Sequence, residues 1–348
     1  MTQLDFSLGI GAEATYGAPV TVTRFPESDA QLSYEITTVD GKGMRPTKAV
    51  KRLLRNSVSK YEGKGSISLD VTTRGFGFLL AAVLGNVQNT MIASSTPPLY
   101  QQNHTLRNTD PVPSYTIQEL LPTLGGNNTF PHTFTGCVFE SLELSAKEGG
   151  ILEAVLEVVT RAMQTDQAAA APSYPTSDGL FTFVHGAVRI GSATAPTLPG
   201  ATALGTWVGV ADAVNVRDVT VRVKRNLDGN GWNLGGAGLR SRRPVLGRAE
   251  ISGSITAEYT DNVLRDAYLQ QTPLALQLTF LHDAAVSSGG SATTAALQIT
   301  IPSLRLKGEV PKSNGGETIT QSIEWEAFDN DVAAQPIVIS YRTLDTTP

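Results

Sequence analysis

The sequence predicts a mainly β, antiparallel fold with two short helices, and two observations lead to this expectation. First, short segments alternate apolar and polar residues, so that every second side chain falls on one face, as a half-buried strand requires. Second, 33 glycines and 19 prolines, together with asparagines, separate these segments as turns. The clearest strand segments are SYEITTV (33–39), GSISLDV (65–71), VRDVTVRV (216–223), EISGSITAEY (250–259) and LALQLTF (274–280). Two further segments favour helix, GFGFLLAAVLG (75–85) and DNVLRDAYLQQ (261–271).

The composition limits the class of protein. A chain of 348 residues with 41% hydrophobic and 17% charged residues is long enough for two or three domains and apolar enough for packed cores. The net charge of −5 gives no overall attraction to nucleic acid or to an anionic membrane. The single cysteine, Cys137, excludes an intrachain disulfide. The first residues lack a signal-peptide pattern, and the longest apolar run (76–84) is too short to span a bilayer, so we expect a soluble protein that folds in the cytoplasm.

One order of elements occurs twice along the chain, which is the pattern of an internal repeat. In each copy a strand leads into a basic loop of 23 residues, then into a second strand, and then into one of the two predicted helices. The copies are 33–39, 40–62 and GKGSISLDVT from 63, and 216–223, 224–246 and GRAEISGSIT from 247. Ile67-Ser68 matches Ile251-Ser252 without a gap.

Matches continue beyond the helices. Each copy has a strand with a similar four-residue segment, then a turn with a Gly-Gly pair, then another strand. The matched segments are Ser141-Leu142-Glu143-Leu144 and Ser303-Leu304-Arg305-Leu306, Gly149-Gly150 and Gly315-Gly316, and Leu156-Glu157-Val158 and Ile323-Glu324-Trp325. We therefore predict two tandem antiparallel β-sandwich or barrel modules, residues 1–163 and 181–348, each with a short helix and a long basic loop. Residues 164–180, rich in alanine and proline, form the expected linker. A chance alignment of two β regions is the alternative.

Positive charge is concentrated in the two long loops. They contain 12 of the 27 basic residues but three of the 32 acidic ones, which leaves 15 basic and 29 acidic residues in the rest of the chain. The basic residues are Lys42, Arg45, Lys48, Lys51, Arg52, Arg55, Lys60, Lys224, Arg225, Arg240, Arg242 and Arg243. Basic loops on an acidic body are suited to docking onto another copy of the chain, because opposite potentials steer and orient contacts. We expect inter-subunit arms that become ordered mainly on assembly; nucleic-acid binding and plain solvated hairpin tips are the alternatives.

Residues that could perform catalysis or bind a metal are not grouped in the sequence. The histidines His104, His132, His185 and His282 are scattered without ligand spacing, so we expect surface or loop roles for them. Cys137 lies in a predicted strand and is expected to be a small buried hydrophobe. The sequence has no GxSxG nucleophile elbow. We expect no enzymatic activity, no cofactor and no metal.

Several segments resemble the tail tube proteins of long-tailed (siphovirus-type) bacteriophages, over nearly the whole chain. They are LGIGAEATYGAPVTVTRFPES (8–28), MRPTKAVKR (44–52), GKGSISLDVTTRGFGFLLAAVLG (63–85), ITIPSLRLKG (299–308) and ITQSIEWEA (319–327). The resemblance implies a structural subunit whose β module joins its neighbours in a ring around a channel, with a long loop reaching the next ring. Because a single tube module is about half this size, the repeat implies two modules per chain and three chains per pseudo-six-fold ring.

The resemblance also implies partners and a location. The subunit is expected to assemble in the host cytoplasm, to reside in the virion tail, and to contact itself, the tape measure, the terminator and the distal tail protein. DNA is expected to pass through the lumen without specific binding. The excess of acidic residues outside the two loops, 29 against 15 basic ones, predicts in addition an acidic channel wall that repels the DNA phosphates. The alternatives are another tail part, such as a terminator or distal ring, and an extracellular β-sandwich binding module.

Overall fold

The computed structural model describes residues 5–94, 96–123, 129–194, 196–208, 215–286, 294–308, 310 and 319–348. Within them the predicted mainly β, antiparallel fold is confirmed, and both predicted helices are present. In chain order the elements are β1 Ser7–Ala12, β2 Asp29–Asp40, β3 Asn56–Asp70, α1 Gly77–Leu84, β4 Gly85–Ala93, β5 Leu99–Leu106, β6 Tyr115–Pro122, β7 Thr129–Ala146, β8 Glu153–Thr160, β9 Ala162–Gln164, β10 Gly186–Ser192, β11 Val216–Lys224, β12 Glu250–Glu258, α2 Val263–Gln270, β13 Leu274–Ala285, β14 Thr294–Lys307, β15 Thr320–Ala327 and β16 Val338–Thr343. The predicted turn at Gly315-Gly316 lies outside the described residues.

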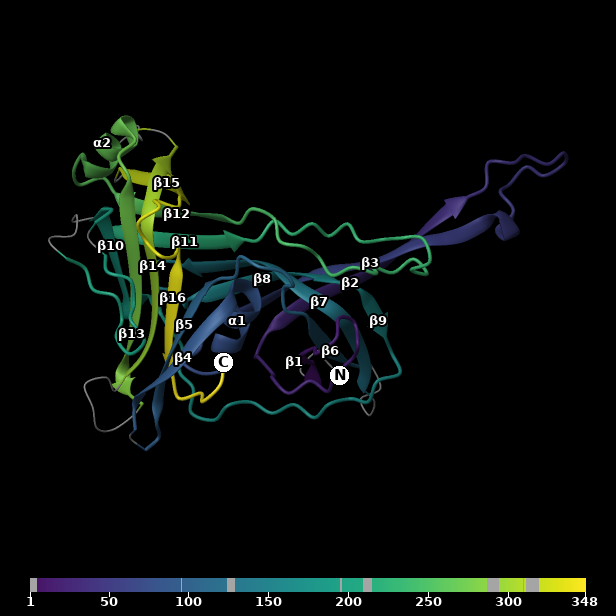
Figure 1. The fold of residues 1–348 in the computed structure, drawn as a ribbon, viewed down its shortest axis with the longest axis horizontal. Coiled ribbons are helices and arrows are strands. Elements are labelled where there is room, and N and C mark those ends of the chain that lie inside the picture. The colour runs from purple at the N-terminus through teal and green to yellow at the C-terminus, as the bar shows by residue number, and fades with distance from the viewer. Residues whose placement is uncertain are drawn as a thin grey trace.

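The strands form one large antiparallel sheet whose central path runs β2-β3-β8-β7-β11-β12-β15-β14-β16-β5-β4 (Figure 1). The two halves of the chain meet in this sheet, because β7 of the first half pairs with β11 of the second. The chain between β9 and a bridge at Leu180, most of the predicted linker, has no helix or strand.

Two long strands, β7 and β14, connect the central path to shorter strands. The first part of β7 pairs with β6 and β9, and its last part pairs with β8 and β11. Similarly, the first part of β14 pairs with β13 and β16, and its last part pairs with β15. β1 then pairs with β6, and β10 with β13. Each half of the chain thus contains a set of six connected strands that includes one long strand.

One face of the central path is buried in the hydrophobic core. Ile67, Leu156, Leu142, Val223 and Ile251 lie directly opposite one another on β3, β8, β7, β11 and β12, and all are buried. Fully burying an aliphatic side chain of this size contributes roughly 1.5–3 kcal/mol. This row crosses the junction between the two halves, so the apolar core is continuous there.

Helix α1 is apolar on nearly all sides because it is enclosed by the sheet. Six of its residues are buried, Leu79 and Leu80 among them, and it ends at Gly85, whose φ of +87° is a left-handed cap conformation that favours glycine. A Cβ at Gly77 would lie 1.9 Å from Oε1 of Gln102, so a larger residue there would have to displace the end of that side chain. No helix in the described part of the chain is long and apolar enough to span a membrane.

The first basic loop is shorter than the sequence predicted. We expected a loop over 40–62, but β2 continues to Asp40 and β3 begins at Asn56, so the loop comprises residues 41–55 and the flanking residues form a two-stranded ribbon. The ribbon extends beyond the rest of the molecule (Figure 1). The prediction failed because residues 56–62 alternate too weakly to indicate a strand, whereas pairing with β2 holds them extended.

A buried carboxyl group in β6 makes the stability of the fold depend on pH. Glu119 is 4% exposed, and its Oε1 has no hydrogen-bond partner. Burial raises the pKa of Glu119 to about 7, although a hydrogen bond from the backbone of Leu32 acts in the opposite direction. The folded state therefore favours the neutral carboxyl, and stability is lost as the pH rises from the ordinary pKa of 4.5 through 7.

We predict that Glu119→Gln stabilises the protein at pH 8 but has little effect at pH 5, since the amide carries no charge to bury. The expected difference in the free energy of unfolding at pH 8 is about 3 kcal/mol, from the size of the pKa shift. Urea denaturation of dilute protein at both pH values measures it, with the exposed Glu35→Gln as control. An equal effect of Glu119→Gln at the two pH values would contradict the assignment.

Candidate functional site

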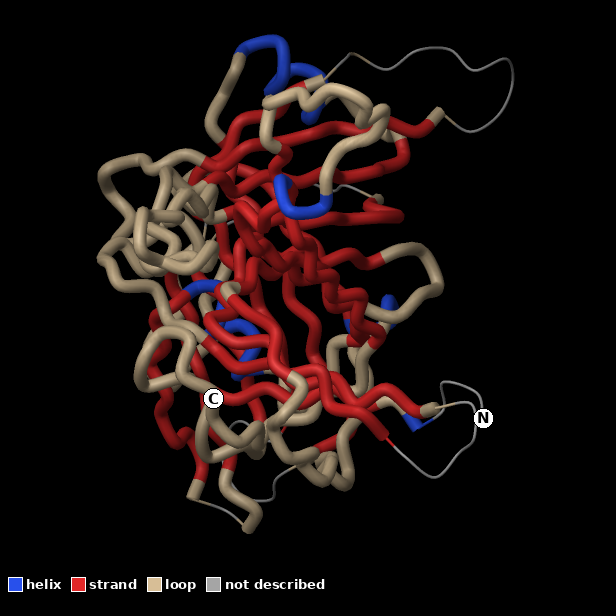
Figure 2. Tube along the Cα trace, turned by 90° about the vertical axis from the view of Figure 1, so that its right-hand side faces the viewer, coloured by secondary structure: helices blue, strands red, loops and turns tan. Residues whose placement is uncertain are grey.

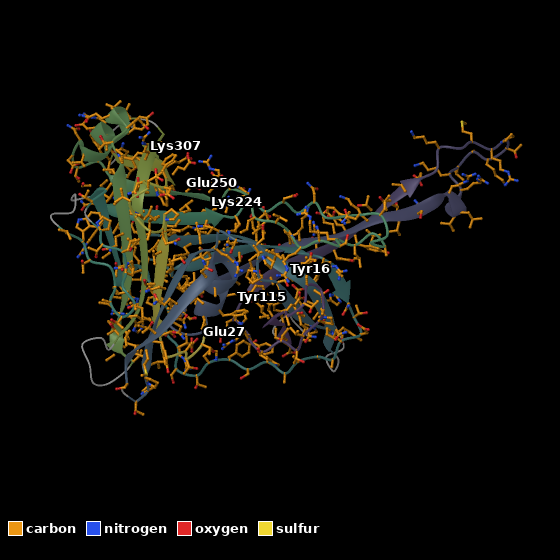
Figure 3. All side chains as sticks on the ribbon, viewed as in Figure 1. Tyr16, Glu27, Tyr115, Lys224, Glu250 and Lys307 are labelled. Atoms are coloured by element: carbon orange, nitrogen blue, oxygen red, sulfur yellow. The ribbon has the colours of Figure 1, made fainter. Side chains whose placement is uncertain are left out.

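The sheet formed by β2, β3, β8, β7, β11, β12, β15 and β14 has a polar face opposite the core. Directly opposed residues on neighbouring strands share a face, so the strand registers define rows of side chains. One row crosses all eight strands as Asp29, Ser68, Val155, Glu143, Arg222, Ser252, Glu326 and Arg305. This row lies one residue along from the buried apolar row and therefore on the other side of the sheet. In Figure 3, Lys224, Glu250 and Lys307 mark the same face on β11, β12 and β14.

Acidic side chains outnumber basic ones on this polar face. The acidic residues are Asp29, Glu35, Glu62, Asp70, Glu143, Glu153, Glu157, Asp218, Glu250, Glu258, Glu324 and Glu326, and the basic ones are Lys60, Lys64, Arg222, Lys224, Arg305 and Lys307. Arg222 is 3.2 Å from Glu157 and 3.9 Å from Glu143, and Lys307 pairs with Glu326. These pairs are solvent-exposed, so each contributes at most about 1 kcal/mol. The face keeps an excess of negative charge.

The basic side chains of the first loop are exposed to solvent. Six of the predicted basic residues lie in residues 41–55, namely Lys42, Arg45, Lys48, Lys51, Arg52 and Arg55, and all except the half-buried Arg52 are exposed. Lys51 pairs with Asp40 at the base of the loop. Apolar side chains on the same loop are also exposed, with Met44 at 99% and Leu54 at 97%. A loop with this much exposed apolar surface is typical of an interaction site.

The second loop, expected over 224–246, comprises residues 225–249 and is held against its own chain. Arg225 is buried and donates hydrogen bonds to the carbonyl oxygens of Val83 and Leu84 at the end of α1. Arg240 is also buried and lies 2.7 Å from Glu62. Arg242 pairs with Asp228 inside the loop, Arg243 donates to the carbonyl of Val112, and Lys224 and Lys60 lie on strands of the polar face. Composition alone cannot distinguish such buried arginines from solvated ones.

Trp232 fixes the second loop to the first half of the chain. Its Nε1 donates a 3.1 Å hydrogen bond to the carbonyl of Tyr61. The side chains of Lys60 and Arg240 lie 4.6 Å and 4.3 Å from its ring centroid, within cation–π range. In addition, the backbone N–H of Tyr61 donates to the carbonyl of Gly238. The pairing of β3 with β8 ends at Gly63 and Thr160. Beyond that point, at Tyr61, the second loop takes the place of β8 as the hydrogen-bonding partner of β3. Figure 2 shows loop segments gathered on one side of the strands.

Two histidines that the sequence separates are brought together. The rings of His185 and His282 are 4.8 Å apart, and Asp283 lies within 3.7 Å of both side chains. Each Nδ1 accepts a backbone N–H, from Thr182 and Ala284. Because these bonds use the Nδ1 lone pairs, Nε2 of His185 bears the proton and faces Asp283, which is the arrangement of a structural hydrogen-bonded cluster.

Of the other candidates from the sequence, His132 is half-buried on β7, and His104 and Cys137 are core residues. His104 was expected at the surface or in a loop, but it is fully buried in β5, and burial lowers its pKa to about 3, so it is a neutral core side chain. The prediction was wrong because β5 is covered on both faces. Cys137 is buried in β7, as predicted.

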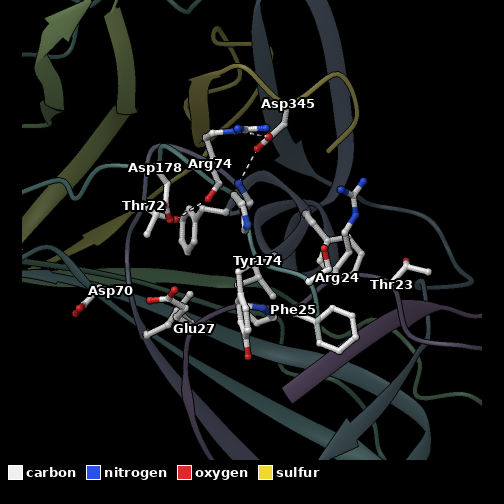
Figure 4. Close-up of a pocket in the computed structure, with 18 residues that line it drawn as sticks. Thr23, Arg24, Phe25, Glu27, Asp70, Thr72, Arg74, Tyr174, Asp178 and Asp345 are labelled. Carbon is white, nitrogen blue, oxygen red and sulfur yellow. Dashed lines mark hydrogen bonds and ion pairs between the residues drawn. The ribbon is translucent and has the colours of Figure 1, made fainter. Parts of the chain in front are cut away.

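A cavity of about 270 Å³ lies where distant segments of the chain meet (Figure 4). Aromatic side chains and carboxylates line it, among them Phe25, Phe76, Tyr174, Glu27, Asp70, Asp178 and Asp345. Arg74 lies 3.2 Å from Asp345, which also accepts a 2.6 Å hydrogen bond from the backbone of Gly75. These contacts hold the C-terminal segment against the start of α1. The cavity is thus lined by a segment near the N-terminus, by the segment that connects the two halves, and by the C-terminal segment.

The polar face ends at two edges that lack a strand partner in the described chain. β2 pairs with β3 alone. The last residues of β14, from Arg305, pair with β15 on one side, while β13 on the other side ends opposite Leu304. An exposed strand edge promotes pairing with a further strand. An acidic sheet face bounded by two open edges, together with a protruding apolar and basic loop, is typical of a structural subunit rather than of an enzyme.

The sequence comparison agrees with this class. A profile of the family described as phage tail tube protein matches residues 5–327, and the chain belongs to that family. No curated protein matches significantly. Membership gives the protein a structural, non-enzymatic role in the tail tube of a virion.

We predict that Trp232→Ala releases the second loop, since it removes one hydrogen bond and two cation–π contacts worth roughly 2 kcal/mol together. Trypsin should then cleave after the newly exposed Arg240 much faster than in the unsubstituted protein. Leu234→Ala, in the same loop at a fully exposed position, is the matched control. Equal cleavage rates in the two variants would show that Trp232 does not hold the loop.

Proposed function

We propose that this protein is the building block of the tail tube itself: copies associate into rings, the rings stack, and the acidic sheet face lines a channel that conducts DNA. The observation that carries the proposal is the eight-strand sheet with an apolar face, an acidic face and two open edges. Copies joined edge to edge close such a sheet into a barrel and remove the exposed edges. A wall with excess negative charge repels phosphates, so DNA slides without sticking.

We further propose that the chain contains two tube modules, residues 1–163 and 181–348, joined by the linker 164–180. The strand pairings support it: β1, β6, β7, β8, β3 and β2 pair in the same order as β10, β13, β14, β15, β12 and β11. The short helix follows the same strand in both sets.

The strand registers agree with two of the three sequence matches that lie in strands. Ser68 and Ser252, matched in sequence, lie in the same row across the sheet, and so do the matched Glu143 and Arg305. The third match is shifted: the registers place Leu156 in line with Ala327 rather than Ile323. The second hairpin is therefore longer than the first.

Two modules per chain make a three-chain ring the natural closed form, because six equivalent modules then surround the channel. The first loop is proposed as the inter-subunit arm. It lies at the tip of the β2–β3 ribbon, which extends beyond the rest of the molecule, and it offers both positive charge and exposed apolar side chains. Its expected partners are other copies first, and the tape measure, terminator and distal tail proteins at the ends of the tube.

We predict that the concentrated protein forms hollow tubes of stacked rings and that each ring contains three chains. Negative-stain electron microscopy tests the tube, and native mass spectrometry of partially dissociated tubes tests the ring, with a species near three times 36.9 kDa expected. Solid filaments or persistent monomers at high concentration would contradict the tube function. A six-chain species would contradict the two-module ring but leave the tube function standing.

We predict that reversing Lys48, Lys51, Arg52 and Arg55 to Glu leaves the monomer folded but prevents tube growth, because the arm would meet the acidic body of a neighbour with like charge. Sedimentation measures assembly, and circular dichroism measures folding. High salt should weaken the wild-type contact in part, since at 1 M the screening length falls to about 3 Å while apolar contacts persist.

A variant with three reversed charges outside the arm controls for most of the change in net charge. Lys147, Arg189 and Arg248 are exposed and lie on other parts of the chain, so their reversal to Glu should permit tube growth. Normal tubes from the arm variant would show that the arm's charge is only solvated.

A further inference from the structure

The two open edges of the polar face carry opposite charges. On the β2 edge, Asp29 begins the row that crosses the eight strands, and Glu27 lies just before it in the chain. On the β14 edge, Arg305 ends the same row, and Lys307 ends the next row on that face. All four side chains are exposed. One edge is thus acidic and the other basic.

The junction between the two halves of the chain shows how such edges pair. There the last part of β7 pairs antiparallel with β11, so that Glu143 lies opposite Arg222. Their side chains approach to 3.9 Å, and Arg222 is also 3.2 Å from Glu157. The same strand pair places the apolar residues Leu142 and Val223 opposite each other on the core side. An acid–base pair on one face and an aliphatic pair on the other therefore fix the register.

The row of eight side chains relates this junction to the open edges. Its first four members lie on β2, β3, β8 and β7, and its last four lie on β11, β12, β15 and β14, in equivalent order. Asp29 therefore occupies the place of Arg222, and Arg305 the place of Glu143. At the open edges the acidic residue is on β2 and the basic residue is on β14, the reverse of the β11–β7 junction. An Asp29–Arg305 pair would still be attractive.

We propose that the segment Glu27–Gln31 of one subunit pairs antiparallel with Ser303–Lys307 of a second copy, with Asp29 opposite Arg305. This inference rests on the proposed self-assembly and names its register. The same register brings Leu304 opposite Ala30 on the core side and Lys307 opposite Glu27 on the polar side. The aliphatic row and the acidic face then continue from one chain to the next.

The β14 edge is only loosely occupied in the single subunit. Its Leu306 carbonyl accepts a 3.4 Å hydrogen bond from Nε2 of Gln271, at the end of α2, which is near the limit for such a bond. A backbone N–H from an incoming strand replaces this contact with a shorter one. The partner is a second copy rather than another protein, because the complementary edge is present on the chain itself.

Disulfide trapping tests the register directly. Directly opposed residues in an antiparallel pair have Cα atoms about 4.5–5.5 Å apart, within the range that a disulfide spans. The variant Asp29→Cys with Arg305→Cys should cross-link between chains in assembled protein under mild oxidation. On a non-reducing gel the products should end at the chain number of one ring. The native Cys137 is buried and should not contribute.

The matched control shifts one cysteine by two residues on the same face. Asp29→Cys with Lys307→Cys places the thiols on a diagonal, about 7–8 Å apart, and should cross-link weakly. Stronger cross-linking in this control than in the first variant would overturn the proposed register. Normal tubes without cross-links in either variant would overturn the edge pairing while leaving the tube function intact. If the protein forms no tubes at all, the proposed function fails, and the pairing fails with it.

Charge exchange gives an independent test. Asp29→Lys alone or Arg305→Glu alone places like charges opposite each other, which should raise the critical concentration for assembly roughly twofold to tenfold. The double variant restores an attractive pair and should assemble at nearly the wild-type concentration. Additive defects in the double variant would contradict the pairing. Thermal melting of dilute monomers should be the same in all three, since both residues are exposed.

Discussion

Each β-strand has hydrogen-bonding groups along both edges, and the need to pair them determines the organisation of this protein. Inside the chain the need is met at the junction of β7 and β11, which joins the two halves in a single sheet. The buried row that crosses this junction continues the apolar core from one half of the chain into the other. At β2 and at the end of β14 the same need is unmet in the isolated subunit. In the proposed assembly, these edges pair between chains as β7 and β11 pair inside the chain.

The two faces of the sheet have different roles in the protein. The apolar face supplies the burial that stabilises the subunit, and the opposite face is free to carry charge because it makes no core contacts. Its carboxylates are only partly neutralised by neighbouring arginine and lysine side chains, as at Arg222 and Lys307. A channel wall needs such a surface: polar enough to hold water, and of the same sign as the polymer that passes it. The basic charge is concentrated in the loops, where it can meet the acidic body of the chain.

Much of the fold could be predicted from local sequence, because alternation and glycine-rich turns are local properties. The strands at 216–223 and 250–259 and both helices were found in this way. What could not be predicted depends on contacts between distant residues. The burial of Arg225 requires the carbonyl groups at the end of α1, and His185 meets His282 only because β10 pairs with β13. Likewise, the acidity of one sheet face was expected from the charge balance, but its residues become known only when the strand registers are known.

The most direct test of the central claim is a cryo-electron microscopy reconstruction of assembled tubes at side-chain resolution. The sheet should be continuous around the lumen, with the side chains of Glu143, Glu157 and Glu250 facing the channel and Ile67 and Leu142 facing the core. A lumen lined instead by lysine and arginine side chains, or by the opposite surface of the subunit, would contradict the claim.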